Sequence, residues 1–426
     1  MSNDTIFALS SGRPPAAVSI IRVSGPEAHS AGIALAGSLP VPRRAAVRTL
    51  RDGFGHVLDD ALVLRFDAPA SSTGQDAVEL HCHGGRAVVG SVLGALGDIE
   101  GLRPAQPGEF TRRAFENGRI DLTEAEGLAD LIEAETEAQR KAALAMAEGG
   151  LRKQVATWQD ELLQLSARAE AAIDYAEEEE TAVDESLIQA ISKLHGELSS
   201  WLERPRVEPL KDGVRVVVAG PPNAGKSSLI NAIAGQDKAI VTDVPGTTRD
   251  QIEVPLNLDG IPVLLTDTAG LRDATEIVER IGIERARSSV ERADILLWLG
   301  DVSEAPSHAR ALILHARSDL PGRAVAPKGT LPVSSVTGAG LPELLTQVGG
   351  LARSVLPAED EVSLNRRQAE LIAEARVALK EGADATDIVL IAESLRFART
   401  AFDRLTGRAG MEDVLDALFG RFCLGK

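Results

Sequence analysis

The sequence is poor in cysteine and lacks long apolar runs, and each shortage excludes a class of protein. Its 426 residues hold only two cysteines, too few for a disulfide scaffold, so we expect a reducing compartment. No apolar run approaches the roughly 18 residues that a membrane-spanning helix needs. The first residues are neither basic nor apolar, so we expect no secretory signal, no membrane association and a cytoplasmic protein.

Basic and aromatic side chains are also scarce. The net charge is −18 and aromatic residues make up 3% of the chain, which is not the composition of a protein that follows phosphate backbones unaided. Residues 120–211 carry 21 acidic and 9 basic residues, whereas residues 1–119 carry 12 of each. A nucleic-acid substrate would therefore have to meet a local patch or a partner protein. The run Glu177–Glu180 is typical of a solvated helix end.

A phosphate-binding motif lies in residues 214–231. A β-branched run is followed by Gly220 to Ser227, which fits G-x-x-x-x-G-K-S/T. The glycines let backbone N–H groups point inward around phosphates, and the next helix offers its positive N-terminus. We expect Lys226 to reach the β- and γ-phosphates and Ser227 to ligate Mg²⁺. The motif predicts binding of a nucleoside triphosphate, with further loop contacts from Asn223, Ala224, Gly225 and Ser228.

A second nucleotide motif, Asp267-Thr268-Ala269-Gly270, follows the apolar run Ile261–Leu265. The Asp can hold Mg²⁺ through water and the Gly amide can sense the γ-phosphate, so D-x-x-G favours a GTPase over an ATPase. Between the two motifs lies a polar loop where a switch would sit, although an ordinary Pro-Gly turn is the alternative. Its candidate nucleotide contacts are Thr242, Asp243, Val244, Pro245, Gly246, Thr247 and Thr248, the last as a second Mg²⁺ ligand.

Hydrolysis must be organised unusually, because Leu271 stands where Ras-like enzymes carry a water-orienting Gln. Asn223 can offer its amide oxygen to a monovalent cation beside the phosphates, which would supply positive charge during catalysis. Glu279 is the nearest downstream carboxylate able to orient the attacking water. From the sequence alone, a solvated helix position is the more frequent role for such a Glu.

The base-recognition motif is altered. After Ala311–Leu314, the expected Asn-Lys-x-Asp reads Ala316-Arg317-Ser318-Asp319. The Asp319 carboxylate can accept both N1–H and N2–H of guanine, and Arg317 can stack on the base as a Lys would. Ala316 cannot replace the Asn amide, so we expect a lower affinity. Ser334 occupies the place of the last base-contacting loop, and guanine remains the predicted base.

The chain divides into a multidomain arrangement. Short β-like runs with Gly and Pro turns predict an α+β domain over 1–118. Ala/Glu/Leu-rich periodicity predicts helices over 119–211 and again over 353–426, which bracket an α/β nucleotide domain at 212–352. This order suggests a nucleotide domain inserted into one helical domain. In His81-Cys82-His83, strand alternation puts both His side chains on one face, but no second ligand pair is visible to favour a metal.

Several segments together resemble the MnmE (TrmE) family of tRNA-modification GTPases from end to end. They are Ile21–Gly25, Thr73–Asp76, Pro107–Phe115, Asn117–Leu122 and Phe422–Lys426. The resemblance implies an N-terminal tetrahydrofolate-binding domain that dimerises, a helical domain and an inserted Ras-like P-loop G domain. It also implies a homodimer whose G domains close on GTP and K⁺, and a heterotetramer with the flavoprotein MnmG, which brings FAD and NADH. The complex would add a carboxymethylaminomethyl or aminomethyl group to C5 of the wobble uridine of certain tRNAs, with a one-carbon tetrahydrofolate as donor.

The resemblance also implies roles for individual residues. Arg22, Glu79, Arg119 and Lys426 align with folate-site residues, and Arg119 replaces what is often Lys. Ser227 and Thr248 align with Mg²⁺ ligands, Glu279 with the residue that orients water, and Lys226 and Asp267 with the phosphate and metal machinery. The departures from the family pattern are Ala316, Arg317, Gln75 and Leu424. The potassium site aligns with Asn223, Thr242, Val244 and Thr247.

Three alternatives stay open at this level. Cys423 is either a packing residue near a helix end or a thiol that takes part in chemistry, since Arg421 and Lys426 are close in sequence. The whole chain could be a ribosome-assembly or regulatory GTPase, although no basic RNA-binding patch is seen. A folate-dependent aminomethyltransferase with an inactive G domain is disfavoured by the intact Lys226, Ser227 and Asp267.

Overall fold

A computed structural model describes residues 4–176, 184–235, 239–241, 253–267, 289–358, 361–409, 412–422 and 424–425. The chain forms two compact units. The first joins Met1–Ala129 to Asp403–Lys426, and the second is Asp130–Phe402. No helix in the described ranges is long and apolar enough to cross a membrane.

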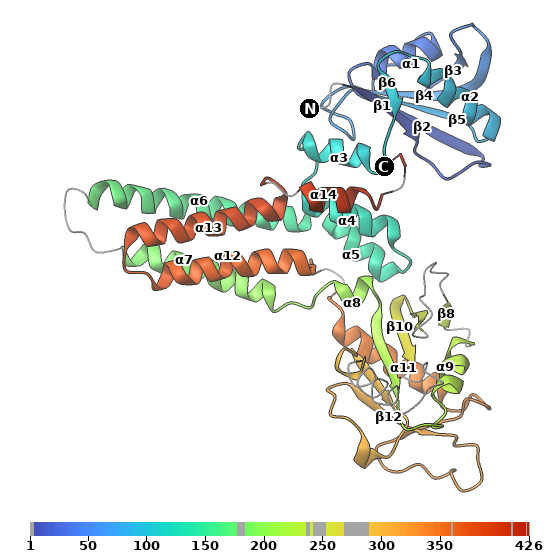
Figure 1. Cartoon of the computed structure of the whole chain (residues 1–426), viewed down its shortest axis with the longest axis vertical. Coiled ribbons are helices and arrows are strands. Elements are labelled where there is room, and N and C mark those ends of the chain that lie inside the picture. The colour runs from blue at the N-terminus through green and yellow to red at the C-terminus, as the bar shows by residue number, and fades with distance from the viewer. Residues whose placement is uncertain are drawn as a thin grey trace, which may run out of the picture. The chain divides into compact units, whose positions relative to one another are not determined.

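The first unit is built on a six-stranded sheet of order β3-β4-β5-β2-β1-β6, with β1 and β6 parallel and the other pairs antiparallel. Two helices, α1 (Ala28–Ala36) and α2 (Arg86–Gly97), lie against the sheet (Figure 1). Their apolar side chains join the core on one face of that sheet. Alternate residues of each strand, such as Ile21 and Val23, point into this core. The strands are β1 (Thr5–Leu9), β2 (Val18–Ser24), β3 (Ala46–Arg51), β4 (Val57–Phe66), β5 (Ala77–His83) and β6 (Leu102–Pro104).

The opposite face of this sheet is only partly covered. Phe110 of α3 (Glu109–Glu116) is buried with Ile6 and Ala8, which point away from the α1 and α2 side. After α3, the helix α4 (Leu122–Glu133) packs against α14 (Glu412–Phe419) through apolar side chains. The two ends of the sequence therefore meet within one unit.

The second unit contains four long helices: α6 (Gly150–Ala176), α7 (Glu185–Leu202), α12 (Arg366–Asp384) and α13 (Ile388–Thr406). In Figure 1 the helices α7 and α12 lie side by side, and the buried Trp158 of α6 stacks on Phe402 of α13 at 5.8 Å. The shorter α5 (Glu137–Ala147) and α8 (Glu208–Lys211) complete the helical part before the second sheet. Helices from before and after that sheet thus form one body, which confirms the predicted insertion.

The second sheet has seven strands in the order β13-β12-β11-β7-β10-β9-β8. The five from β13 to β10 are parallel, and β9 and β8 run antiparallel to their neighbours. Helices α9 (Lys226–Ala234) and α11 (Leu341–Val355) bury their apolar faces in its core. This is the predicted α/β fold. The strands are β7 (Val214–Ala219), β8 (Ala239–Val241), β9 (Glu253–Leu258), β10 (Ile261–Asp267), β11 (Ile295–Trp298), β12 (Ala311–Ala316) and β13 (Leu331–Val333).

The short β-like runs predicted over 1–118 form strands β1 to β6, the β-branched run before the phosphate loop forms β7, and the predicted helical ranges are confirmed. Strand alternation in β5 is also as predicted, since Cys82 is buried while His83 is exposed. The three boundaries between the four predicted segments stay predictions, because the compact units divide the chain differently. The acidic run 177–180 lies outside the described residues.

Candidate functional site

The phosphate loop connects β7 to α9, and two glycines give it its shape. Gly220 has a φ of +150°, and a Cβ there would lie 3.2 Å from the carbonyl carbon of Leu299. Gly225 has a φ of +101° and directly precedes the first residue of α9. Both positions need glycine, because L-residues with side chains rarely adopt such φ values. The loop thus places the helix N-terminus at the carboxyl edge of the parallel strands, where α/β proteins bind ligands.

Lys226 is folded back over this loop. Its side chain is buried, and Nζ donates to the carbonyl oxygens of Gly220 at 2.9 Å and Pro221 at 3.0 Å. Burial lowers the pKa of the Lys226 ammonium, and the nearby Asp267 carboxylate opposes that shift. The ammonium therefore lies among acceptors, as a group that binds phosphate oxygens should.

Ser227 and Asp267, predicted as partners of one Mg²⁺, are brought together from residues 40 apart in sequence. The Ser227 hydroxyl donates to Asp267 Oδ2 at 2.8 Å, and Asp267 is buried at the end of β10, which pairs with β7. A hydroxyl and a carboxylate are the hard oxygen donors that Mg²⁺ prefers. The donor set therefore fits the ion.

Arg317 reaches from the end of β12 to the phosphate loop. It follows β12 with a φ of +58°, and its Nη2 donates to the main-chain oxygen of Asn223. Asn223 itself has a φ of +59°. The guanidinium thus ties the base-recognition segment to the phosphate loop. Stacking of Arg317 on a base stays a prediction.

The two loops predicted to recognise the base are neighbours because β12 pairs with β13. The Ser318 N–H donates to the Val333 oxygen at 3.2 Å, which places Asp319 beside the loop that begins at Ser334. Ser334 is fully buried, and its hydroxyl accepts from the Thr337 N–H at 3.1 Å. The Ser334 hydroxyl therefore stabilises the turn that follows it.

Part of the predicted machinery lies outside the described residues. These positions are Thr242, Asp243, Val244, Pro245, Gly246, Thr247, Thr248, Thr268, Ala269, Gly270, Leu271, Glu279, Cys423 and Lys426. Of the predicted potassium ligands, the structure describes Asn223 alone. Ala224 and Ser228 lie in the phosphate loop and the first turn of α9.

Two of the residues predicted to bind folate form an ion pair on the partly covered face of the first sheet. Arg22 of β2 and Glu79 of β5 are cross-strand partners, and their side chains approach to 3.0 Å. Their side chains are 22% and 18% exposed. The Arg22 guanidinium also lies 5.6 Å from the ring centroid of Phe110, within cation–π range. Charge and an aromatic face are thus combined in a half-buried position.

Two further segments approach this face. The segment Thr73–Asp76 brings Gly74 against Arg119, since a Cβ on Gly74 would lie 3.1 Å from Arg119 Cγ. Thr73 in turn shares a hydrogen bond of 2.7 Å with Ser24, two residues from Arg22. Near the C-terminus, a Cβ on Gly425 would lie 2.1 Å from the Leu9 oxygen, so Gly425 lies against the end of β1.

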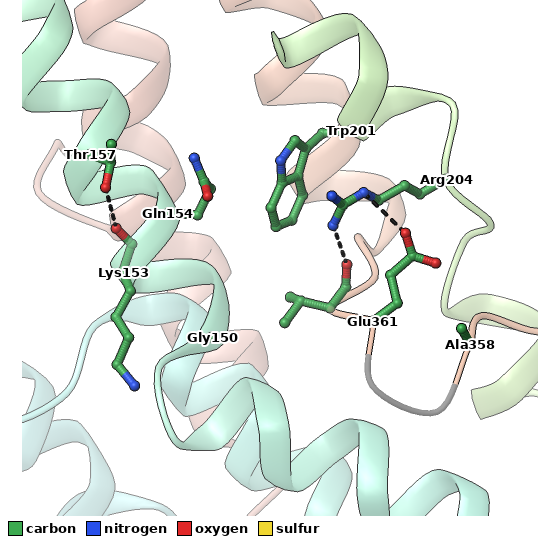
Figure 2. A pocket seen from close by; sticks show the side chains of 9 residues that line it. Gly150, Lys153, Gln154, Thr157, Trp201, Arg204, Ala358 and Glu361 are labelled. Carbon is green, nitrogen blue, oxygen red and sulfur yellow. Dashed lines mark hydrogen bonds and ion pairs between the residues drawn. The ribbon is translucent and has the colours of Figure 1, made fainter.

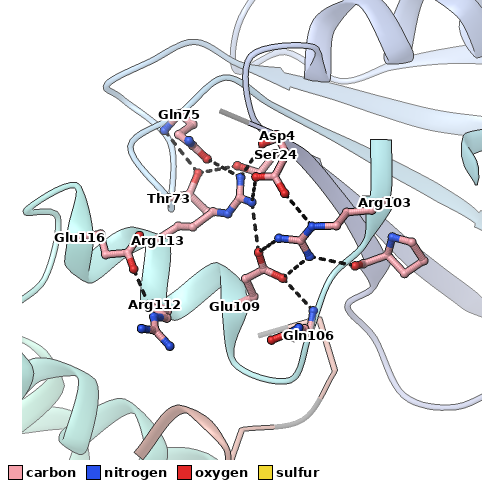
Figure 3. A network of polar contacts seen from close by, with 11 residues as sticks. Asp4, Ser24, Thr73, Gln75, Arg103, Gln106, Glu109, Arg112, Arg113 and Glu116 are labelled. Atoms are coloured by element: carbon pink, nitrogen blue, oxygen red, sulfur yellow. Dashed lines mark hydrogen bonds and ion pairs between the residues drawn. The ribbon is translucent and has the colours of Figure 1, made fainter. Parts of the chain in front are cut away.

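Sequence reasoning missed a charge network in the first unit, in which Arg113 and Glu109 are largely buried while Arg103 and Asp4 are partly exposed. Figure 3 shows the guanidinium groups of Arg103 and Arg113 converging on the carboxylates of Asp4 and Glu109. Burial would raise the pKa of Glu109, but hydrogen bonds from Arg103, the Gln106 N–H and Arg113 hold it below its ordinary value. The pKa of Asp4 is lowered by the same two guanidinium groups against the effect of burial. The repeated Arg in Pro107–Phe115 was the available signal, but the partner Asp4 lies 109 residues from Arg113.

The chain enters and leaves the second sheet through two segments that lie together. Arg204 covers the Trp201 ring at 3.8 Å, pairs with Glu361 at 3.1 Å and donates to the Val362 oxygen (Figure 2). The Val207 N–H also donates to the Leu364 oxygen at 3.2 Å. A cavity of about 720 Å³ lies beside these contacts, between Trp201 and residues of α6 such as Gln154. The segments that enter and leave the second sheet are therefore held together by an ion pair and by hydrogen bonds.

Comparisons with known proteins agree over the whole chain. The sequence model of the MnmE helical domain matches residues 122–423, and that of the GTP-binding protein TrmE N-terminus matches residues 5–119. The chain is 53% identical over 427 residues to the tRNA modification GTPase MnmE of Erythrobacter litoralis, covering 99% of this chain and 100% of that protein. It is 50% identical over 432 residues to the protein of the same name from Zymomonas mobilis, with the same two coverages. The chain therefore belongs to the MnmE family of tRNA modification GTPases.

Proposed function

We propose that this chain is a potassium-activated GTPase that works with a flavoprotein of the MnmG type. Together they add a carboxymethylaminomethyl or aminomethyl group to C5 of the wobble uridine of certain tRNAs, with folate as one-carbon donor. The observation that carries GTP hydrolysis is the convergence of Lys226, Ser227 and Asp267 at one edge of the second sheet. Membership of the MnmE family connects that hydrolysis to tRNA.

In this proposal Lys226 binds the β- and γ-phosphates, Ser227 ligates Mg²⁺, and Asp267 holds that ion through water. Asp319 reads guanine, while Arg317 secures the phosphate loop through the Asn223 oxygen. Mg²⁺ supplies positive charge to the transferring phosphoryl group. Glu279 orients the attacking water, a task that Leu271 cannot perform.

Potassium activation rests on the amide oxygen of Asn223, together with Thr242, Val244 and Thr247. Support comes from the phosphate loop, where the unusual φ of Asn223 and the hold of Arg317 on its main chain fix the residue's position. We expect GTP hydrolysis to fall sharply when KCl is replaced by NaCl. An Asn223→Ala variant should hydrolyse GTP equally slowly in both salts; a rate in KCl that this change leaves intact would refute the assignment.

The folate site is proposed around Arg22 and Glu79, with Arg119 and Lys426. The half-buried ion pair suits a ligand that has both N–H donors, on its pterin, and carboxylates, on its glutamyl tail. The Phe110 ring offers an apolar surface beside it. Bound folate would supply the one-carbon unit.

Homodimerisation is supported by exposed apolar side chains on the same sheet face. Val47 of β3 and Leu62 of β4 are cross-strand partners with 65% and 37% exposure, and Val18 of β2 is 53% exposed. Exposed apolar side chains that gather on one face often mark an interface. A Leu62→Glu change should shift the molecular mass in solution from dimer toward monomer, measured by light scattering.

The decisive experiment is nucleoside mass spectrometry of bulk tRNA from cells that lack this protein. We expect the 5-substituted wobble uridines to disappear and to return when the wild-type chain is expressed. A Lys226→Ala variant should not restore them, and neither should Arg22→Ala, which leaves the nucleotide site unchanged. Unchanged wobble uridines, with ribosomal subunits accumulating instead, would favour a ribosome-assembly GTPase.

A further inference from the structure

A histidine and two carboxylates meet on the first unit, in a place that neither the GTP site nor the proposed folate site uses. They come from three separate segments: His29 from α1, Asp67 from just after β4, and Asp76 from just before β5. One donor atom from each lies within 4.8 Å of the others, and all three side chains are partly buried. The group closes the ends of the loop 67–76.

The hydrogen bonds fix which ring nitrogen of His29 carries a proton. Nε2 lies 3.1 Å from the main-chain oxygen of Phe66, which can only accept, so Nε2 is the N–H donor. In the neutral ring, Nδ1 then presents its lone pair, and it faces Asp76 Oδ2 at 3.5 Å. The other oxygen of Asp76 already accepts the Ala68 N–H at 2.8 Å. Two acceptors therefore face each other.

Such a pair requires a cation between its members. A proton on Nδ1 would make a charge-assisted hydrogen bond, which is normally about 2.7–2.9 Å long. The observed 3.5 Å is longer, but it suits two ligands of one metal ion. With metal–ligand bonds of about 2.0–2.2 Å, donors this far apart subtend about 110° at the ion, close to a tetrahedral angle.

The surroundings resemble those of a metal-bound histidine. Such a ring usually donates its second N–H to a main-chain carbonyl or carboxylate, as Nε2 of His29 does to Phe66. Asp67 Oδ1 lies 3.5 Å from His29 Nε2, and Arg65 donates to both Asp67 oxygens, at 2.7 and 3.3 Å. The carboxylate still keeps lone pairs for an ion, because it has about four acceptor sites. One imidazole with two carboxylates favours Zn²⁺ or a similar ion over Mg²⁺ or Ca²⁺, which prefer all-oxygen sites.

We propose that His29, Asp67 and Asp76 bind a Zn²⁺-type divalent ion that fastens the loop 67–76 to α1. This loop carries Thr73 and Gly74, which contact Ser24 and Arg119, so the ion would hold that contact surface in place. The inference stands on the cluster alone and does not depend on the proposed function.

The test is a Zn²⁺ titration of the full chain against a coloured chelator, after stripping with EDTA and saturation of the nucleotide site with Mg²⁺ and GDP. We expect the wild type to bind one more zinc per chain than His29→Gln or Asp76→Asn. Loss of a hydrogen-bond partner of a ligand costs about 10–100-fold in metal affinity, so loss of a ligand should cost at least that. Each variant must first be shown to fold by circular dichroism. Two variants are used so that the test still stands if one of them fails to fold.

His83→Gln is the matched control. His83 Nδ1 lies 2.7 Å from Asp59 Oδ1, an ordinary hydrogen bond, and among the described residues no third donor completes that pair. This variant should bind zinc like the wild type, and zinc should slow hydrogen exchange of the 67–76 peptides in both. Zinc binding that survives His29→Gln would overturn the proposal. So would a wild type that binds no zinc, since a proton would then occupy the place between Nδ1 and Asp76.

Discussion

Removal of the Arg113 guanidinium should destabilise the first unit far more than the same change at its neighbour Arg112. Arg113 is only 2% exposed, and its two Nη atoms donate to the main chain and carboxylate of Asp4, to Gln75 and to Glu109. An Arg113→Met change keeps much of the apolar stem and leaves these acceptors without their donor. Loss of one partner from a buried ion pair costs about 3–5 kcal/mol.

Two features place the expected cost at the lower end of that range, near 3 kcal/mol. Arg103 still pairs with both Asp4 and Glu109, so neither carboxylate is left alone. Within the described structure, Nε of Arg113 is buried without a hydrogen-bond partner, which already reduces what the side chain contributes. Arg112→Met removes pairs to Glu116 and Asp416 from a side chain that is 38% exposed, and such surface pairs contribute about 0–1 kcal/mol.

Hydrogen exchange with mass spectrometry is the suitable assay, because the three tryptophans lie outside the first unit and would not report its unfolding. The free energy of opening should be read from β1 and β2 peptides in wild type, Arg113→Met and Arg112→Met. Equal losses in the two variants would refute the reasoning. The pKa values of Asp4 and Glu109 are lowered in the folded state, so the network's stabilisation is complete above their unfolded values of 3.8 and 4.5. It should be lost as the pH falls through the folded values, and the gap between variant and wild type should then narrow.

Three further predictions concern single side chains. Asp267→Asn should weaken Mg²⁺-dependent GTP binding by about 10–100-fold, because a carboxylate that orients the ion's water is lost. Titration of a fluorescent GTP analogue in Mg²⁺ and in EDTA measures this affinity. An equal loss of affinity in EDTA would contradict the metal role. Arg317→Ala should raise the GDP dissociation constant about tenfold, because removal of a charged hydrogen-bond donor costs about 1.5–3 kcal/mol. Arg317→Lys should recover part of the lost affinity. Equal affinities of both variants and wild type would contradict a role for the hydrogen bond to Asn223 in GDP binding. Cys82 should resist alkylation by iodoacetamide at neutral pH in the native chain, because burial and the Asp59 charge raise the pKa of its thiol to about 12. Mass spectrometry that detects alkylated Cys82 before unfolding would contradict this prediction.

Sequence patterns were sufficient for the elements that depend on local order. The phosphate loop, the parallel strands and the helices on either side follow from periodicity and from the positions of Gly220 and Gly225, which admit few alternative structures. The meeting of Ser227 with Asp267 was also predictable, since parallel strands deliver their carboxyl ends to the same edge. Local chemistry and known topology suffice for such a site.

The buried networks could not be predicted, because they depend on partners far apart in sequence. Arg113 and Asp4 are separated by 109 residues, and no motif marks Asp4 as the partner. His29, Asp67 and Asp76 each look like an ordinary polar residue, and only the packing of α1 beside the loop 67–76 brings them together. By contrast, the two histidines of His81-Cys82-His83 lie close in sequence and suggested a metal site, yet they pair separately with Glu79 and Asp59.

Arg317 shows how a departure from a family motif changes the physical role of a position. The chain has lost the Asn that normally begins this motif, and Ala316 cannot contribute its amide. The guanidinium of Arg317 instead donates to the main-chain oxygen of Asn223, so a residue of the predicted base-recognition segment restrains one of the residues expected to hold K⁺. We therefore expect base recognition and cation binding to be coupled through this side chain. If that coupling operates, Arg317→Ala should raise the KCl concentration needed for half-maximal GTP hydrolysis, whereas Asp319→Ala should weaken guanine binding without that shift.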